Sequence, residues 1–218
     1  MKTFEPDKAK VWLEQYATDA IAAVEMIFVA GFVHGDLDGR IVVDLGIGTG
    51  RLAIPALFFG AERAVGIEVD EDALVLAREN AELFGVRPRL DLVQADATQA
   101  PALLAPIQQT HRAGGITVVM NPPFGVQDKG ADTRFLDAAL AIPGVRVIYS
   151  CHLSGEKNRA FLKRYIERAG WILSELRQVN MMLPKLYEFH EKVRKQIQVD
   201  IYRITCGMDQ TRNIEKKE

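Results

Sequence analysis

Short runs of branched aliphatic residues alternate with helix-like segments along most of this 218-residue chain, and this alternation restricts the fold more strongly than any other feature. Three such runs come first, at 41–46, 64–70 and 89–96, with helix-like segments at 51–60 and 71–85 between them. A helix that connects two strands of one sheet crosses over its face, so the strands pair in parallel. The sequence therefore predicts an α/β fold with a mostly parallel sheet flanked by helices.

The second half of the chain continues this pattern. We expect strands at 116–120 and 145–150, helices at 133–142 and 156–170, and two closing strands at 171–179 and 196–205. Before the first strand, Thr18 is expected to cap a helix that runs through Gly31 and covers the sheet. The stretch from Thr98 to Gly114, which contains proline and glutamine, is interpreted as a connector.

Length and composition favour one packed domain over residues 1–218, with an N-terminal helical segment (1–39), a core (40–206) and a frayed tail (207–218). The sequence MKTFEPDKAK at the start lacks the apolar stretch of a signal peptide, so we expect a cytoplasmic protein. The two cysteines stand far apart without metal-ligand spacing, so we expect no metal site. The formal net charge of −2 gives no strong positive field, and contact with nucleic acid would need a local patch or a partner.

The turn DLGIGTG directly follows the first strand and places Gly46, Gly48 and Gly50 before the next helix. Glycine lets the backbone turn tightly and approach a ligand, and the helix N-terminus points to the same place. The spacing is GxGxG and Asp44 precedes it, whereas dinucleotide-binding turns have GxGxxG. A carboxylate in this position repels a pyrophosphate and attracts a cation. The turn therefore favours S-adenosylmethionine over a nicotinamide dinucleotide.

Two further acids end the next two strands. Glu68 closes the second strand, where a carboxylate can accept both ribose hydroxyls, and Asp96 closes the third, where it can accept from an adenine amine. Their neighbours Val69 and Ala97 belong to the same expected cofactor site. A helix cap explains one or two such acids but not their regular placement at three successive strand ends.

The fourth strand ends in NPPF, and these four residues form the candidate catalytic loop. Pro122 and Pro123 fix an extended turn, so the Asn121 side chain and the Pro122 carbonyl can both face outward as acceptors. Two acceptors suit an NH₂ group, because holding both hydrogens lets a conjugated nitrogen approach tetrahedral geometry as a methyl group arrives. Phe124 would stack on the planar group. A proline-stiffened loop without chemistry is the alternative.

Together, DLGIGTG, GIEVDEDAL, QADAT and NPPF resemble the class I S-adenosylmethionine-dependent amino-methyltransferases. NPP followed by an aromatic residue does not choose between adenine, guanine and a glutamine amide. Four further segments favour adenine, because they resemble the methyltransferase-like protein 5 family of ribosomal RNA adenine-N6 methyltransferases. These segments are LEQYAT, KGADTRFLDAAL, YSCHLS and LPKLYEFHEKVRKQIQVDIYR. This resemblance covers about residues 12–205.

The resemblance implies the Rossmann-like class I methyltransferase fold, with a seven-stranded sheet and an N-terminal helical cover. It implies that Gln15 and Thr18 close over the methionine end of the cofactor. Asp44 and the three glycines match the family's cofactor turn, Glu68 its ribose-binding acid and Asp96 its adenine-binding acid. The loop from Asn121 to Phe124 matches its catalytic loop, and Asn121 is also counted in the cofactor site. Ile47 departs from the pattern, since a small residue is expected there.

The segment 183–195 lies between the two closing strands and can reach over the active-site edge of the sheet. It combines positive charge with flat aromatic surfaces, as single-stranded RNA requires. The candidate RNA-binding residues are Lys185, Tyr187, Phe189, Lys192, Arg194 and Lys195. Glu188 and Glu191 dilute the charge, so a solvated loop is the alternative. The basic face of the helix at 156–170 is a weaker candidate, expected to contact only the RNA backbone, because helices commonly carry such faces for solubility.

The strand at 89–96 is expected at the edge of the sheet, with Leu90 and Leu92 on one face and Val93 on the other. The resemblance implies a small zinc-binding activator protein docked there by strand addition. The catalytic domain is expected to occupy nearly the whole chain, without a separate domain to read a DNA sequence, so we expect a structured RNA as the substrate. The resemblance implies that this RNA is small-subunit ribosomal RNA. Guanine-N2 methylation of RNA, methylation of a protein glutamine and a non-catalytic RNA-binding scaffold stay open.

Overall fold

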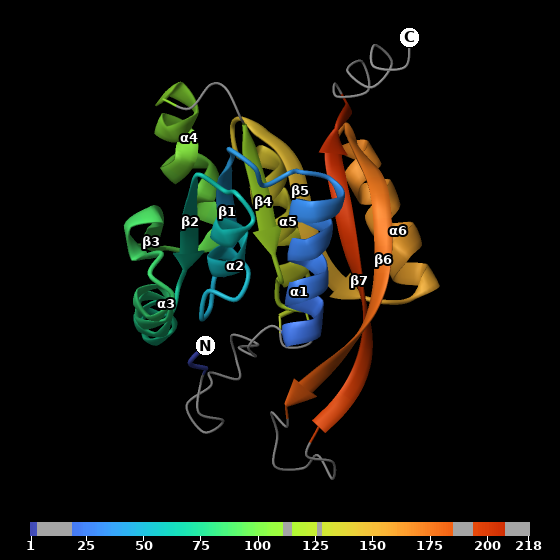
Figure 1. The fold of residues 1–218 in the computed structure, drawn as a ribbon. Helices are drawn as coiled ribbons and strands as arrows, with labels where there is room; N and C mark the ends of the chain where they lie inside the picture. The colour runs from blue at the N-terminus through green and yellow to red at the C-terminus, as the bar shows by residue number, and fades with distance from the viewer. Residues whose placement is uncertain (4–18, 111–114, 126–127, 185–193, 208–218) are drawn as a thin grey trace.

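The computed structural model describes residues 1–3, 19–110, 115–125, 128–184 and 194–207 and contains a seven-stranded sheet in the order β3-β2-β1-β4-β5-β7-β6 (Figure 1). The strands are β1 (Ile41–Leu45), β2 (Arg63–Glu68), β3 (Leu90–Gln94), β4 (Ile116–Met120), β5 (Val145–Leu153), β6 (Trp171–Pro184) and β7 (Arg194–Cys206). Neighbouring strands are parallel except that β7 runs antiparallel to β5 and β6. The expected α/β fold is confirmed, and β3 lies at the edge as predicted.

Helices cover both faces of this sheet. One face carries α1 (Ala20–Phe28), the π-helix η2 (Val29–Val33), α2 (Ala53–Phe58) and α3 (Glu71–Leu83), and the other carries α4 (Ala100–Thr110), α5 (Ala131–Ala141) and α6 (Glu156–Arg168). Short 3-10 turns at Arg87–Arg89 and Ala97–Gln99 flank β3. Figure 1 views the sheet from the side of α1 and α2. Within the described ranges, every helix is too short or too polar to cross a bilayer.

The central strands are buried on both faces, which explains their sequences. All residues of β1 and β4 are buried, and apart from Asp44 and Thr117 they are apolar. A strand covered by helices on both sides reads as a continuous apolar run, because neither face meets water. A carboxylate in the middle of such a strand opposes folding, so Asp44 needs a functional explanation.

The prediction of a connector between residues 98 and 114 is wrong. A 3-10 turn and α4 occupy residues 97–110, with Leu104 buried against the sheet. Pro101 lies in the first turn, where its missing N–H has no intrahelical partner to lose. Pro106 lies inside the helix, and the two prolines hid the helical pattern.

The N-terminal helix also differs from the prediction at both ends. Its cap is Asp19, whose Oδ1 accepts a hydrogen bond from the Ile21 N–H at 2.9 Å, so Thr18 is not the cap. The α-helix ends at Phe28, and the chain continues as the π-helix η2 to Val33, two residues beyond the predicted end at Gly31. Thr18 itself lies outside the described residues.

The β6-β7 hairpin is longer than the sheet that supports it. Strand β5 pairs with β7 only as far as Leu153 opposite Val199, whereas β6 and β7 stay paired as far as Pro184 opposite Arg194. The hairpin stem, defined here as residues 180–184 and 194–198, therefore projects from the edge at which the parallel strands end (Figure 1). The two closing strands are confirmed, but both are longer than predicted.

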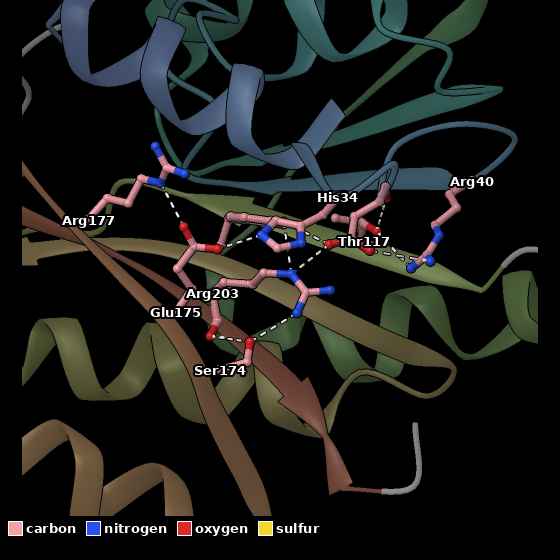
Figure 2. Close-up of polar contacts among 9 residues, drawn as sticks. His34, Arg40, Thr117, Ser174, Glu175, Arg177 and Arg203 are labelled. Atoms are coloured by element: carbon pink, nitrogen blue, oxygen red, sulfur yellow. Dashed lines mark hydrogen bonds and ion pairs between the residues drawn. The ribbon is translucent and has the colours of Figure 1, made fainter. Parts of the chain in front are cut away.

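A polar network ties the N-terminal helical segment to the sheet. Asp36, 3% exposed, follows η2 and accepts hydrogen bonds from the Tyr149 hydroxyl at 2.7 Å and Arg203 Nε at 2.8 Å. Nearby, His34 Nε2 lies 2.5 Å from Glu175 Oε2 (Figure 2). These contacts satisfy a buried carboxylate and fix the entry to β1.

Candidate active site

The sheet order reverses between β1 and β4, and ligands of open α/β sheets bind at the carboxyl ends of strands at such a point. In register, Leu45 lies opposite both Ile67 of β2 and Met120 of β4, and Glu68 lies opposite Gln94 of β3. The residues that follow these four strands are therefore neighbours. The structure brings the three predicted acids, the glycine turn and the NPPF loop to one edge of the sheet.

The glycine turn is held against β2. Gly46 donates to the Ile67 carbonyl at 2.8 Å, and the φ angles of Gly46, Gly48 and Gly50 are +73°, +52° and +85°. Residues with a Cβ rarely adopt such angles. A Cβ at Gly46 would also lie 3.1 Å from the Phe135 ring of α5. The turn therefore needs glycine for its conformation, and at Gly46 for the space that the Phe135 ring occupies.

Ile47, the departure from the family pattern, is accommodated by the neighbouring strand. It is 4% exposed and lies over Gly66 of β2, where an added Cβ would be only 3.0 Å from Ile47 Cβ. Glycine at position 66 thus provides the space that a small residue at position 47 would otherwise provide.

Asp44 is 1% exposed and lies beneath the start of α2. Its Oδ2 accepts a hydrogen bond from the Ala53 N–H at 3.0 Å, and its Oδ1 has no hydrogen-bond partner among the described residues. Burial raises the pKa of Asp44 to about 8, although the Ala53 hydrogen bond opposes this shift and nearby Glu68 adds to it. A cation beside this carboxyl would stabilise its charged form.

Glu68 ends β2 and faces the glycine turn. Its Oε2 accepts from the Gly48 N–H at 3.0 Å, and its Oε1 accepts from the N–H groups of Val69 at 2.9 Å and Asp70 at 3.1 Å. Burial raises its pKa, and these three donors oppose the shift. The contacts fix the carboxylate relative to the turn, and the expected part of Val69 in the cofactor site stays a prediction.

Asp96 differs from the other two acids because it is exposed and caps the 3-10 turn before α4. Its Oδ1 accepts from the Thr98 N–H at 2.8 Å and the Thr98 hydroxyl at 2.6 Å. The hydroxyl hydrogen bond is the main cause of its lowered pKa. Capping therefore accounts for these contacts of Asp96, its expected hydrogen bond with an adenine amine stays a prediction, and Ala97 is buried beside it.

The NPPF loop follows β4 immediately. Asn121, Pro123 and Phe124 are half-buried, and Pro122 is buried. Phe124 packs against the hydrophobic cluster on the α1 side of the sheet and keeps part of its surface exposed. The loop is thus held against this cluster, and the Asn121 Oδ1 atom is itself buried.

A buried polar chain braces the strand beside this loop. Ser150 Oγ lies 2.7 Å from His152 Nε2, and His152 Nδ1 lies 3.8 Å from Asp132 Oδ2 in the first turn of α5. The proximity of His152 lowers the pKa of Asp132, and burial opposes this shift. This chain connects β5 with the helix that follows the NPPF loop. Sequence reasoning used YSCHLS only for its resemblance and missed this contact.

Several predicted site residues lie outside the described part of the chain, namely Gln15, Thr18, Lys185, Tyr187, Phe189 and Lys192. Arg194 and Lys195 belong to β7 and pair with Pro184 and Leu183 in the hairpin stem. This pairing places their backbone, and their expected contacts with RNA stay a prediction.

Asn80 is a site residue that sequence reasoning missed. It lies in α3, is fully buried, and donates to the Thr49 carbonyl in the glycine turn at 2.9 Å. Its helical spacing from Ala73 and Ala77 places it on the buried face of α3, and an amide on such a face needs a polar partner. That position is the signal that could have identified it.

The chemistry of the site suits S-adenosylmethionine. The unsatisfied Asp44 Oδ1 matches a cationic ligand, and at Gly48 an added Cβ would meet only the Gly46 carbonyl, at 4.0 Å. Two more carboxylates follow on the next strands, where hydroxyl and amine donors of a nucleoside could bind. Fold and site together define a class I S-adenosylmethionine-dependent methyltransferase.

Comparisons with known proteins assign the family. The chain is 34% identical to rRNA N(6)-adenosine-methyltransferase METTL5 of Danio rerio (91% of this chain, 91% of the relative) and 33% identical to Mettl5 of Drosophila melanogaster (93% and 91%). The crystal structure of a candidate RNA methyltransferase from Pyrococcus horikoshii is 33% identical, with a TM-score of 0.79 over 94% of this chain and 93% of that one. The chain belongs to the METTL5 family of rRNA N(6)-adenosine-methyltransferases.

A narrower match concerns the cofactor half alone. The model of the ribosomal protein L11 methyltransferase (PrmA) family matches residues 19–108, which end before β4 and the NPPF loop. This similarity covers the glycine turn and the three acids. It therefore supports the cofactor and carries no information on the methyl acceptor.

Proposed function

We propose that this protein methylates the N6 amine of an adenosine in ribosomal RNA, and more specifically in small-subunit RNA. The observation that carries the proposal is the position of the NPPF loop, which follows β4 beside the glycine turn where the sheet order reverses. Family membership supports adenosine as the acceptor, because the named relatives are rRNA N(6)-adenosine-methyltransferases.

The chemistry divides between the cofactor and the chain. Bound S-adenosylmethionine supplies an electrophilic methyl group. The Asn121 side-chain oxygen and the Pro122 carbonyl accept the two hydrogens of the amine, and this frees the nitrogen lone pair from conjugation with the ring. Phe124 stacks on the base, which must leave its own stack to reach the loop.

The hairpin stem is our candidate support for RNA. It projects from the edge that carries the NPPF loop, and its strands lead to the predicted basic and aromatic segment at 183–195. A long two-stranded stem can hold such a segment beyond the body of the sheet. Positive charge there would contact phosphates, and aromatic rings would stack on unpaired bases.

The edge strand β3 is our candidate docking site for a small zinc-binding activator protein. It pairs only with β2, so one side of its backbone has no strand partner in the described sheet. Strand addition would satisfy those groups. Hydrogen exchange at residues 90–94 should slow on addition of the activator, and unchanged exchange there would rule out this edge.

The deciding experiment supplies purified protein with labelled S-adenosylmethionine and unmodified small-subunit RNA, followed by nucleoside mass analysis. We expect N6-methyladenosine with the wild-type chain and none with Asn121→Ala, which should still bind the cofactor. Label in N2-methylguanosine or in a protein glutamine would replace the proposal with the corresponding rival. If the purified protein is inactive and cell extract restores methylation, an activator is required. If no methylation occurs in extract and the protein binds no cofactor, the non-catalytic scaffold is favoured.

A further inference from the structure

Asn80 connects three segments that are distant in the sequence. From α3, its Nδ2 donates to the Thr49 carbonyl at 2.9 Å and to the Lys2 carbonyl at 3.0 Å, while its Oδ1 accepts from the Lys2 N–H at 2.6 Å. The side chain is 0% exposed. One amide thus holds the glycine turn and both backbone polar groups of residue 2.

The contact with residue 2 is specific to its backbone. A carboxamide offers one donor and one acceptor side by side, as a peptide group does, so it can pair with the N–H and C=O of a single residue. The Lys2 side chain makes a separate ion pair with Glu79 at 2.8 Å, but both side chains are largely exposed. An exposed ion pair contributes little, so the backbone pairing is the structurally important part.

The other end of the amide acts on the turn itself. Thr49 is 3% exposed and lies between Gly48, whose N–H donates to Glu68 at 3.0 Å, and Gly50, whose N–H donates to Ile47 at 2.9 Å. Removal of the Asn80 donor would leave the buried Thr49 carbonyl without this partner, and the peptide would have to rotate toward another. Rotation there changes the direction of the backbone groups that face the cofactor.

We propose that Asn80 is a positioning residue that couples the docking of residues 1–3 to the conformation of the glycine turn. Cofactor affinity then depends on the backbone of residue 2, which lies far from the turn in the sequence. The part that concerns affinity rests on the proposed cofactor site at Gly46–Gly50; the part that concerns the conformation of the turn does not.

The test removes the N–H group of residue 2 that donates to Asn80 and leaves Asn80 and the glycine turn unchanged. Lys2→Pro lacks the N–H that pairs with Asn80, and Lys2→Ala is the matched control, since it keeps that N–H and loses only the ion pair with Glu79. By calorimetry, we expect the Kd for S-adenosylmethionine to rise about fivefold in Lys2→Pro and less than twofold in Lys2→Ala. Asn80→Ala should raise it further, and Lys2→Pro should add nothing in the Asn80→Ala background.

A second measurement needs no cofactor. In the free protein, amide hydrogen exchange over residues 48–53 should accelerate in Lys2→Pro and stay at the wild-type rate in Lys2→Ala. Equal exchange and equal Kd in the two variants would overturn the proposal, and so would additive effects of Lys2→Pro and Asn80→Ala. If the wild-type chain bound no S-adenosylmethionine, the proposed cofactor site would fail, and exchange over 48–53 would still decide whether the coupling exists.

Discussion

The two halves of the active-site edge are built differently. On the cofactor half, formed by β1 to β3, carboxylates and a glycine turn are fixed by backbone N–H groups and by the buried Asn80. On the half proposed to bind the substrate, a hairpin stem extends five residue pairs beyond the last β7 residue that pairs with β5. A preorganised set of carboxylates and backbone groups suits one small ligand of fixed shape, whereas a projecting arm suits a large one. A change in one half should therefore affect one ligand and spare the other.

The largest effect is expected at the centre of the cofactor half. Asp44→Asn removes the buried carboxylate that a cationic ligand would neutralise, and we expect the Kd for S-adenosylmethionine to rise about 100-fold, as for loss of a charged hydrogen bond. RNA affinity should stay within twofold of the wild type. Calorimetry measures the Kd for the cofactor, and a filter-binding assay measures the affinity for RNA. Retained cofactor affinity would exclude Asp44 from the site.

The same substitution should stabilise the fold, increasingly so as pH rises. The pKa of Asp44 is about 8 in the folded chain against 3.8 for an ordinary aspartate, so the folded state keeps a proton that the unfolded chain has already lost. The free energy of unfolding of the wild type therefore falls as pH rises through this window, and asparagine removes the loss. The gain in Tm of Asp44→Asn should be about 5 °C larger at pH 8 than at pH 5. A gain that shrinks with pH would contradict the raised pKa.

The next effect is expected on the substrate half. Replacement of Lys192, Arg194 and Lys195 by alanine should weaken RNA binding about tenfold and reduce the slope of log K against log salt by about 2, because about 0.7 counterion is released for each phosphate on a single strand. The control removes three exposed charges from α6, at Lys157, Arg164 and Arg168. Equal losses in both variants would mean that general charge, and not the hairpin, attracts RNA.

A smaller effect on the cofactor half is expected from Gly66→Ala. The new Cβ would crowd Ile47 and push the glycine turn away from β2, since Ile47 Cβ is only 3.0 Å from its position. We expect about a fivefold rise in the Kd for S-adenosylmethionine. The double variant Ile47→Ala with Gly66→Ala should restore affinity, and failure of that rescue would show that crowding is not the cause.

The smallest effect should come from Asp96→Ala. Loss of this cap costs about 1 kcal/mol, and the Tm at pH 7 should fall by about 3 °C. The pKa of Asp96 is lowered, so its contribution is present above the ordinary aspartate value and is lost as the pH falls below it. The difference in Tm from the wild type should therefore stay nearly constant down to about pH 4 and shrink below it, the opposite trend to Asp44. A constant difference would mean that the charge plays no part.

Sequence reasoning predicted the parts of the molecule that local pattern controls. Apolar runs located the strands, and a glycine or an acid after each run located the site, because parallel strands bring their carboxyl ends to one edge. Helix α4 was missed because Pro101 and Pro106 resemble a loop when the capping interaction of Asp96 is not considered. The cap at Asp19 was missed by one residue, since Thr18 is also a residue type found at N-caps.

Other features depend on contacts between distant residues. The full length of β6 and β7 follows from their pairing with each other, and the sequence of one strand does not identify the strand with which it pairs. The link from Asn80 to Lys2 spans 78 positions. The space for Ile47 exists only because Gly66 lies in the neighbouring strand. Spacing within one segment cannot reveal such relationships.

The antiparallel direction of β7 gives the hairpin a property that the rest of the sheet lacks. Because β6 and β7 meet at the carboxyl edge, residues can be inserted at their tip without moving any crossover helix or any strand of the cofactor half. Two residues added to each strand lengthen the arm by about 6.7 Å and keep every existing side chain on its own face. Proteins with this topology can thus evolve reach toward substrates of different size through insertions alone, while the chemistry at the strand ends stays the same.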